Sequence, residues 1–387
     1  MAVPRLLCPS PSVRDRTGKG FSMATPANEH ELRAMRRALE IAVTPGVPLG
    51  PNPRVGCVLL RADGTVLAEG FHEGAGTSHA EAAALANAAG AGIDTRGATA
   101  VVTLEPCNHT GRTAPCADAL LAAGVARVVY AQADPNPVAA GGAAHLSEEG
   151  IDVLGGVLVD EARALNPTWT FAQERGRPFV TWKFATTLDG RSAAADGTSQ
   201  WISSATARRD THRLRAVCDT VLVGTGTVIT DDPQLTVRDA DENPLPRQPL
   251  RAVMGVRDLP ARARVFDGSA GTVHLRTREP GEALVQLQHR ERNHVFLEGG
   301  PTLAAAFLRA GLIDEVVVYV APMLLGAGRN AVADLGIETI ADARHFDVSD
   351  VTVLEAPGED TCVRITMTAQ APVVATEEPE AALEEEA

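Results

Sequence analysis

Three side chains in the first half of the chain have the types and spacing of metal ligands. Cys107 and Cys116 stand in LEPCNHTGRTAPC with eight residues between them, and His79 precedes them in GTSHAEAAA. Zinc in proteins is bound by imidazole and thiolate, and a catalytic zinc site uses three protein ligands so that the fourth position stays open for water. His79, Cys107 and Cys116 therefore predict one catalytic Zn²⁺ per chain.

Glu81, two residues after His79, is the group that such a site needs for hydrolysis. Two thiolates neutralise the charge of the ion, so the metal acidifies its water less than it would beside three histidines. A neighbouring carboxylate is then needed to take up the proton of the water and to deliver it to a leaving amine. We therefore expect Glu81 to be the catalytic residue.

Each of these residues also has a plain structural reading. Ser78 and Glu81 are spaced as a helix capping box, which would explain Glu81 without catalysis. The two cysteines could be buried thiols, because free cysteine is a common small core residue. His109 could replace either cysteine as a ligand. The combination of H-A-E with P-C-x8-C favours the metal site over these alternatives.

The elements around the motif alternate between helix and strand. A helical pattern follows Asn28, and VGCVLL and VLAEG predict a hairpin. Helices are then expected at HAEAAALANAA, at CADALLAAG and near 141–149, and strands at ATAVVTLEP and ARVVYAQ. This alternation is typical of a layered α/β domain with a largely parallel sheet. Residues 159–173 are expected to form one helix that leaves this domain.

The pattern breaks around Glu174-Arg175-Gly176-Arg177-Pro178, where we place the domain boundary. The predicted first domain spans 24–176 and the second 177–371. The basic segment 1–23 and the acidic segment 372–387 are expected to be disordered extensions, with Met23 as an alternative start to Met1.

Composition narrows the class of protein. The chain has 387 residues, is 45% hydrophobic and 22% charged, and carries a formal net charge of -14. This acidity argues against a broad nucleic-acid-binding surface, although a local basic pocket for one phosphate is compatible with it. No stretch approaches the roughly 20 apolar residues of a membrane helix. Without an export signal, the cysteines are expected in the reducing cytoplasm, where paired cysteines more often bind metal than form disulfides.

The H-A-E and P-C-x8-C motifs resemble those of the zinc-dependent nucleoside and nucleobase deaminases, whose signature is H-x-E followed by P-C-x-x-C. The chain departs from that signature because eight residues separate its cysteines. It is similar in this to the bifunctional riboflavin-biosynthesis deaminase/reductases, and PNPRVGCV, GFHEGAGTSHAE and DPNP match them too. The resemblance implies a cytidine-deaminase-like α/β/α domain followed by a dihydrofolate-reductase-like α/β domain.

The resemblance also implies a reaction for the first domain. The substrate would be 2,5-diamino-6-(5-phosphoribosylamino)pyrimidin-4-one, a small phosphorylated pyrimidine. Zinc-bound hydroxide would attack the carbon that bears the 2-amino group, Glu81 would shuttle protons, and ammonia would leave. Asn52 and His72 stand at matching motif positions and are expected to contact the base. Alternatively, Asn52 is a turn residue before Pro53 and His72 a capped surface side chain.

The second half shows weaker signals of its own. Gly299-Gly300 precede a helix that starts at Pro301, and free backbone N–H groups at such a start suit an anion. VGTGTVITDDPQLTVR lacks the third glycine of a G-x-G-x-x-G fingerprint. Strands at DTVLVG, LRAVMGV, TVHLR, HVFLEGG, EVVVYVAP and TCVRITMTA are interleaved with helices near 204–216, 282–290 and 301–310. From these residues alone, the half is predicted to be an α/β domain with a helix start that suits a phosphate, although glycine turns and single arginines more often have only a structural role.

By resemblance to the reductase half of the same family, this domain uses NADPH to reduce the ribosyl group to the ribitylamino compound. The residues expected to face the cofactor are Ala185, Trp201, Thr227, Asp231, Gly300, Pro301, Thr302, Leu303, Ala304, Ala305 and Ala306. Those expected to face the substrate are Ser199, Arg215, Leu235, Arg238 and Glu298, with the arginines as phosphate partners. Met254-Gly255-Val256 departs from the aspartate and small hydroxyl residue of the family.

The leading hypothesis is therefore a two-activity riboflavin-pathway enzyme that acts on a small molecule as a homo-oligomer, without a nucleic-acid or membrane partner. Two alternatives stay open. One is a single-activity base deaminase whose second domain is non-functional. The other is a non-catalytic zinc-stabilised binding protein, in which His109 would close the site as a fourth ligand.

Overall fold

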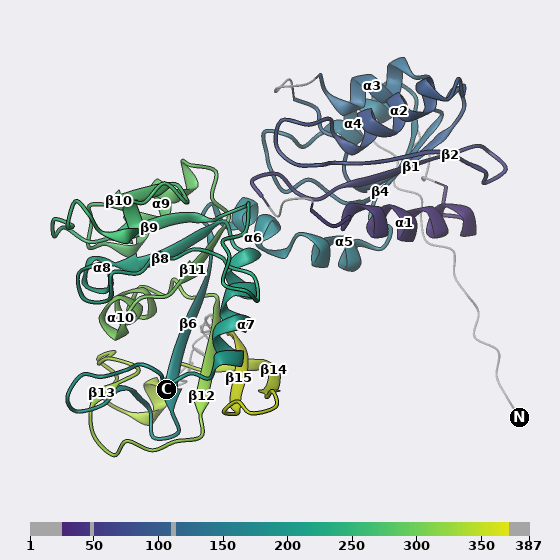
Figure 1. Ribbon diagram of the computed structural model, residues 1–387. Helices are drawn as coiled ribbons and strands as arrows, with labels where there is room; N and C mark the ends of the chain where they lie inside the picture. The colour runs from purple at the N-terminus through teal and green to yellow at the C-terminus, as the bar shows by residue number, and fades with distance from the viewer. Residues whose placement is uncertain (1–24, 47–49, 110–113, 371–387) are drawn as a thin grey trace, which may run out of the picture. The chain divides into compact units, whose positions relative to one another are not determined.

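The computed structural model describes residues 25–46, 50–109 and 114–370. These residues group into two compact units, each of which is considered by itself (Figure 1). The first unit takes the described residues up to Pro45 and then Val55–Leu165, and the second takes Gly46–Arg54 and the chain from Asn166 onward. The predicted extensions 1–23 and 372–387 lie outside the described residues, and the domain boundary at 176 stays a prediction.

The first unit is built on a five-stranded sheet with the order β2-β1-β3-β4-β5. The strands are β1 (Gly56–Leu60), β2 (Val66–Phe71), β3 (Thr99–Leu104), β4 (Arg127–Gln132) and β5 (Asp152–Leu154). β1 pairs antiparallel with β2 and β3, whereas β3, β4 and β5 are parallel. The predicted hairpin is confirmed, but the sheet is mixed and not largely parallel, because two of its four strand pairings are antiparallel. The carboxyl ends of β3 and β4 thus open at the same edge.

Helices cover both faces of this sheet (Figure 1). α1 (Glu29–Ala42) and α5 (Val159–Leu165) lie on one face, and α2 (Ala80–Gly90), α3 (Cys116–Ala122) and α4 (Gly142–Glu148) lie on the other. α1 starts at a capping box in which Asn28 and Glu31 each accept from the other's backbone N–H. Small alanines on α2, such as Ala80, Ala84 and Ala88, are fully buried and let the helix lie close to the sheet.

The expected single helix over 159–173 is wrong, because the structure divides it. α5 ends at Leu165, and α6 (Pro167–Arg175) begins with proline at its first turn after Asn166. Proline fits a helix start but breaks a helix interior, since it lacks the N–H and clashes with the preceding turn. Asn166 also binds the backbone of Arg54, with its Oδ1 accepting from N and its Nδ2 donating to O, each at 2.8 Å. These two hydrogen bonds hold Arg54 against Asn166 within the second unit.

The second unit contains an eight-stranded sheet with the order β10-β9-β8-β11-β6-β12-β15-β14. Its strands are β6 (Phe179–Thr187), β8 (Thr220–Gly224), β9 (Leu250–Met254), β10 (Thr272–Leu275), β11 (His294–Leu297), β12 (Glu315–Ala321), β14 (Phe346–Leu354) and β15 (Cys362–Ala369). The first six in spatial order are parallel, β15 pairs antiparallel with β12, and β14 pairs antiparallel with β15. Two short strands, β7 (Arg191–Ala193) and β13 (Arg329–Asn330), pair separately.

Helices flank both faces of this sheet as well. α9 (Pro280–Gln288) and α10 (Pro301–Arg309) pack through Leu284 and Phe307 on the main core. α7 (Ala205–Ala216) and α8 (Thr225–Asp231) pack on the opposite face. The 3-10 helices are η1 (Arg264–Phe266) and η2 (Ile340–Asp342). The predicted α/β fold class is confirmed. Within the described ranges, no helix combines the length and apolar content that a bilayer crossing requires.

Candidate active sites

The three predicted metal ligands of the first unit come together. The Nδ1 atom of His79 lies 3.6 Å from Sγ of Cys107 and 3.3 Å from Sγ of Cys116, and all three candidate ligand atoms lie within 4.8 Å of one another. Tetrahedral ligands at zinc distances of about 2.0–2.3 Å are separated by roughly 3.3–3.8 Å, so the donor set fits this ion. His109 does not belong to the cluster. Within the described part of the chain, the site therefore has three protein ligands and not four.

The three ligands lie at the ends of helices and strands, and these ends determine their positions. His79 is the N-cap residue of α2, Cys107 follows the end of β3, and Cys116 is the first residue of α3. The backbone N–H of Cys116 donates to Sγ of Cys107 at 3.4 Å. Hydrogen bonding with the Cys116 thiol, followed by that with His79, lowers the pKa of Cys107 to about 4. The same hydrogen bond and burial raise the pKa of Cys116. A thiolate is the form of cysteine that binds a metal, so Cys107 is already prepared for an ion, whereas Cys116 would lose its proton when the ion binds.

Glu81 lies in the first turn of α2 and is buried, with 4% of its surface exposed. The capping-box alternative is wrong, because the N-cap is His79 and no side chain caps this helix. Burial raises the pKa of Glu81 to about 7, and its carboxyl group also hydrogen-bonds with Cys116. A buried carboxyl with a pKa near neutrality can both accept and return a proton, which is the behaviour of a general acid and base.

His72 stands edge-on to His79, with 5.4 Å between ring centroids. Its Nδ1 donates to the carbonyl oxygen of Ser78 at 2.9 Å, which fixes the tautomer of a neutral ring, and burial lowers its pKa. The alternative of a surface side chain is wrong for His72, because only 4% of it is exposed. Asn52 lies in the Gly46–Arg54 segment, which groups with the second unit. Its contact with the base stays a prediction.

Glu105 is a buried residue of this site that the sequence analysis did not single out. Its carboxylate accepts from the backbone N–H groups of Asp134, Gly141 and Ala143, each at 3.1 Å. These bonds fasten the loop after β4 beside the Pro106-Cys107 peptide. The sequence carried a signal for this role. Glu105 stands in LEPC, two residues before the ligand Cys107, and DPNP supplies the loop that Glu105 holds.

Gly142 allows the closest backbone approach at this site. A Cβ placed there would lie 1.8 Å from the carbonyl oxygen of Pro106, the residue before Cys107. We therefore expect Gly142→Ala to displace the Cys107 ligand and to lower the zinc retained after dialysis, measured by metal analysis. The control is Gly90→Ala at the end of α2, where a Cβ meets nothing within 4 Å. Equal zinc content in both variants would contradict this reading.

A cavity of about 540 Å³ in the second unit gathers most of the predicted substrate residues. Arg215, Leu235, Arg238 and Glu298 line it, and so does Trp201, which was expected to face the cofactor. Ser199 is not among its lining residues. The lining also includes residues that the sequence analysis did not name: Lys183, Ser203, Arg208, Thr211, His212, Pro233, Gln234, Thr236, Glu242 and Arg264. Its five lysine and arginine side chains against two carboxylates suit an anionic ligand.

The inner wall of this charged pocket is a buried ion-pair network. Arg215 binds both carboxylate oxygens of Glu298, with Nη2 3.0 Å from Oε2, and its Nη1 donates to the carbonyl of Thr236 at 3.0 Å. Nζ of Lys183 lies 4.0 Å from Glu298. Burial, the largest single cause, favours the neutral carboxyl, but the charge and hydrogen bonds of Arg215 together with the charge of Lys183 outweigh it, so the pKa of Glu298 is lowered. Burial lowers the pKa of Lys183. The pocket thus holds a charged carboxylate beside a lysine whose ammonium form is destabilised by burial.

The predicted cofactor residues lie mainly at two helix starts. α8, which carries Thr227 and Asp231, follows β8, and α10, which begins at Pro301, follows the adjacent parallel strand β11. A Cβ placed on Gly224, at the start of α8, would lie 3.7 Å from Cδ2 of Leu303 on α10, so the two helix starts are close together. The two helices pass to opposite faces of the sheet. Neighbouring parallel strands whose helices diverge in this way open a crevice at their carboxyl ends, where nucleotides bind.

Not all predicted cofactor positions are open to a ligand through their side chains. Ala304 and Ala305 are buried on the sheet side of α10, so that only their backbone can serve a ligand. Ala185 of β6 packs beside the cluster under α7. Gly300 and Thr302 are exposed at the helix start. The roles of these residues stay predictions.

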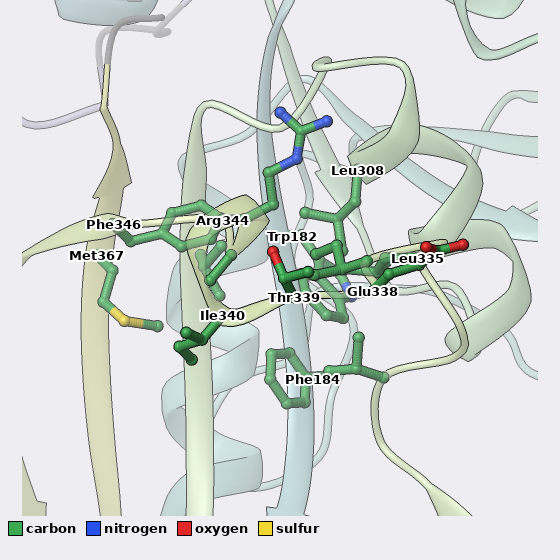
Figure 2. A pocket seen from close by; sticks show the side chains of 14 residues that line it. Trp182, Phe184, Leu308, Leu335, Glu338, Thr339, Ile340, Arg344, Phe346 and Met367 are labelled. Atoms are coloured by element: carbon green, nitrogen blue, oxygen red, sulfur yellow. The ribbon is translucent and has the colours of Figure 1, made fainter. Parts of the chain in front are cut away.

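A second cavity of the second unit, of about 500 Å³, is apolar (Figure 2). Trp182 and Phe184 of β6 stack at 4.2 Å between ring centroids, and Leu308, Phe346 and Met367 come from α10, β14 and β15. None of the predicted site residues lines it. This cavity lacks the convergent polar groups of the charged pocket, so it is not the candidate active site.

Comparison with known families decides the assignment. Residues 28–132 match the cytidine and deoxycytidylate deaminase zinc-binding region, and residues 178–354 match the RibD C-terminal domain. The riboflavin biosynthesis protein RibD of Mycobacterium tuberculosis is 52% identical over 303 residues, which cover 78% of this chain and 88% of that protein. That of Escherichia coli is 40% identical over 365 residues, covering 86% and 98%. The chain belongs to the RibD family.

Solved RibD structures align with most of this chain. Acinetobacter baumannii RibD is 37% identical with a TM-score of 0.79, and covers 88% of this chain and 99% of its own. A Thermotoga maritima diaminohydroxyphosphoribosylaminopyrimidine deaminase/5-amino-6-(5-phosphoribosylamino)uracil reductase is 32% identical with a TM-score of 0.73, at 88% and 99% coverage. This RibD-family chain is thus a bifunctional riboflavin biosynthesis enzyme, with a zinc-dependent deaminase and an NADPH-dependent reductase domain.

Proposed function

We propose that the chain carries out two consecutive steps on one phosphorylated pyrimidine. The first unit hydrolyses 2,5-diamino-6-(5-phosphoribosylamino)pyrimidin-4-one to 5-amino-6-(5-phosphoribosylamino)uracil and ammonia. The second reduces the ribosyl group of that product to the ribityl chain. The observation that carries the proposal is the three-ligand cluster of His79, Cys107 and Cys116 beside the buried acid Glu81. The substrate specified for the Thermotoga maritima relative supports the same pair of reactions.

In the deaminase unit, His79, Cys107 and Cys116 would hold the zinc ion, which when bound lowers the pKa of water and makes it a nucleophile at neutral pH. Glu81 accepts the proton of the attacking water and donates it to the departing amine, which leaves as ammonia. The neutral His72 ring stands beside His79, where it can hydrogen-bond the pyrimidine. Asn52 is proposed as a second contact to the base.

In the reductase unit, NADPH would occupy the crevice at the starts of α8 and α10 and supply the hydride. Glu298 and Lys183 are the titratable pair in the adjacent pocket and are proposed to move the proton that accompanies reduction. Arg215 keeps the Glu298 carboxylate charged and in place, and Arg238 binds the substrate phosphate. Burial lowers the pKa of Lys183, and the neighbouring cations lower that of Glu298, and such shifted pKa values are frequent at active sites.

Two further parts of the proposal concern the setting of the enzyme. We infer a cytoplasmic location, because a thiolate metal site with five unpaired cysteines among the described residues suits a reducing compartment. We also infer a homo-oligomer that acts on a small molecule and has no nucleic-acid partner.

Removal of the metal tests the division of labour. Dialysis against a strong zinc chelator is expected to lower ammonia release by about a hundredfold or more, because the water loses its activation. NADPH oxidation with the deaminated substrate should be unchanged in the same sample, and added zinc should restore ammonia release. If the chelated protein deaminates at the original rate, the zinc assignment fails, and if reduction is also lost in folded protein, the two sites are not separate.

A further inference from the structure

Arg264 lies on η1 at the wall of the reductase pocket and was not among the predicted site residues. It forms no ion pair with a carboxylate within the described ranges. Its Nη2 donates to Oε1 of Gln234 at 2.9 Å, and the same oxygen accepts from Nη2 of Arg238. One neutral amide oxygen thus holds two guanidinium groups side by side. The positive charges of Arg238 and Arg264, bound to the same oxygen atom, repel each other, and an anion bound between them would relieve this repulsion.

The side chain of Gln234 is held in place by hydrogen bonds on the side away from the two arginines. Its Nε2 donates to Oδ2 of Asp267 at 2.8 Å, and Oδ1 of Asp267 accepts from Arg251 at 2.7 Å. Arg251 is completely buried in β9, and it also donates to the carbonyl oxygens of Asp267, at 2.7 Å, and Gln234, at 3.2 Å. The backbone N–H of Arg264 donates to Asp232 at 2.7 Å. Such a multiply bonded support holds a binding group in place before the ligand arrives.

The charges of the two arginines are open to an anionic ligand. Arg238 pairs with Glu242, but that carboxylate is 71% exposed, and an ion pair of this kind is worth little against water. Planar guanidinium groups bind phosphate oxygens through two parallel hydrogen bonds, which a single lysine cannot reproduce. A pair of guanidiniums beside the Lys183–Glu298 wall therefore suits a phosphomonoester whose sugar reaches that wall.

We propose that Arg264 binds the phosphate of the phosphoribosyl substrate together with Arg238, and that Gln234 is the positioning residue that sets their separation. The inference rests on the proposed reductase function and adds to it two residues, Arg264 and Gln234, that determine recognition of the phosphate. The 2′-phosphate of NADPH shares the same chemistry, and the experiment below separates the two sources.

The test compares Arg264→Ala with Arg276→Ala, a control at an exposed arginine that pairs with Asp258. For Arg264→Ala, kcat/KM with the deaminated, phosphorylated substrate should fall about 10- to 100-fold, as expected for loss of a hydrogen bond to a charged group. With the dephosphorylated substrate it should match the wild type. Gln234→Leu should raise KM for the phosphorylated substrate only and leave kcat unchanged. The Arg276→Ala control should behave as the wild type throughout.

Other outcomes overturn the proposal in distinct ways. An equal loss with both substrates would mean that Arg264 only supports the fold. A loss of preference for NADPH over NADH, with substrate KM unchanged, would assign the phosphate to the cofactor. A second readout needs no turnover: inorganic phosphate should raise the unfolding temperature of the wild type and of Arg276→Ala, but less that of Arg264→Ala. If the wild type does not turn over, the proposed function fails, whereas an equal phosphate effect in all three proteins sinks the Arg264 assignment.

Discussion

Replacement of Glu81 by glutamine is expected to abolish ammonia release while zinc stays bound. The amide has nearly the size of the carboxyl group, so the buried space at the start of α2 stays filled. It cannot accept the proton of the water or return one to the amine, and general acid–base catalysis contributes about 10²- to 10⁴-fold to rate. His79, Cys107 and Cys116 are untouched, so metal analysis should give the wild-type zinc content.

A control for this variant lies on the same connection. Glu73 is exposed and is not one of the three candidate ligands, so Glu73→Gln should deaminate at close to the wild-type rate. NADPH oxidation with the deaminated substrate should be normal in both variants. Full deaminase activity in Glu81→Gln would remove the general base from the account and would favour a zinc site of purely structural purpose.

Arg215→Met should have the largest effect on stability in the second unit. The substitution leaves the buried Glu298 carboxylate without its bidentate partner, and breaking a buried pair in this way costs about 3–5 kcal/mol. All three tryptophans, Trp169, Trp182 and Trp201, belong to this unit, so tryptophan fluorescence in urea reports its unfolding selectively. NADPH oxidation should be lost as well, because the Glu298 side chain and the other residues that line the pocket would no longer be held in position.

The matched control is Arg213→Met, two residues earlier on α7, where the guanidinium is 62% exposed and pairs with Asp210 on the same helix. Its free energy of unfolding should change by less than about 1 kcal/mol. Because the pKa of Glu298 is lowered on folding, the pair stabilises the fold above the unfolded pKa of about 4.3. That stabilisation is lost as the pH falls through the folded pKa. The difference between wild type and Arg215→Met should therefore narrow in acid, and a difference independent of pH would contradict the ion-pair explanation.

The zinc cluster could be predicted from the sequence because its residues sit in two short motifs at element ends. H-A-E places the imidazole and the acid on one helix start, and P-C-x8-C spans the strand end and the next helix start. Local spacing then determines which side chains converge. The same reasoning could not exclude His109 as a ligand, because a loop residue between two cysteines has no periodicity that fixes its direction.

The reductase pocket was only partly predictable because its walls come from distant segments. Lys183 on β6, Gln234 after α8 and Arg264 on η1 meet only after the sheet has formed. In the sequence, Lys183 is one lysine in an apolar strand, and Arg264 is one of several arginines in a polar loop. Only the tertiary structure brings these residues together. Arg251 looks like an ordinary strand residue in the sequence, but it is fully buried and donates to the backbone of Asp267 in the loop that follows Arg264.

Two errors of element prediction have simple physical reasons. The expected helix over 159–173 kept its apolar spacing through Asn166-Pro167, but the proline ends one helix and starts another. β14 was overlooked because FDVSDVTVL is rich in polar residues and is largely exposed in the structure. It is an edge strand that pairs only with β15, and edge strands need no continuous apolar sequence.

The most direct test of the whole account is the stoichiometry of the coupled reaction on one purified chain. Given the diaminopyrimidine substrate without NADPH, the protein should release one ammonia per substrate and form no ribitylamino product. Addition of NADPH should then give one NADPH oxidised for each ammonia released, with the ribitylamino uracil as product. NADPH oxidation without prior ammonia release, or ammonia release that never leads to NADPH oxidation, would contradict the assignment of two consecutive activities to this chain.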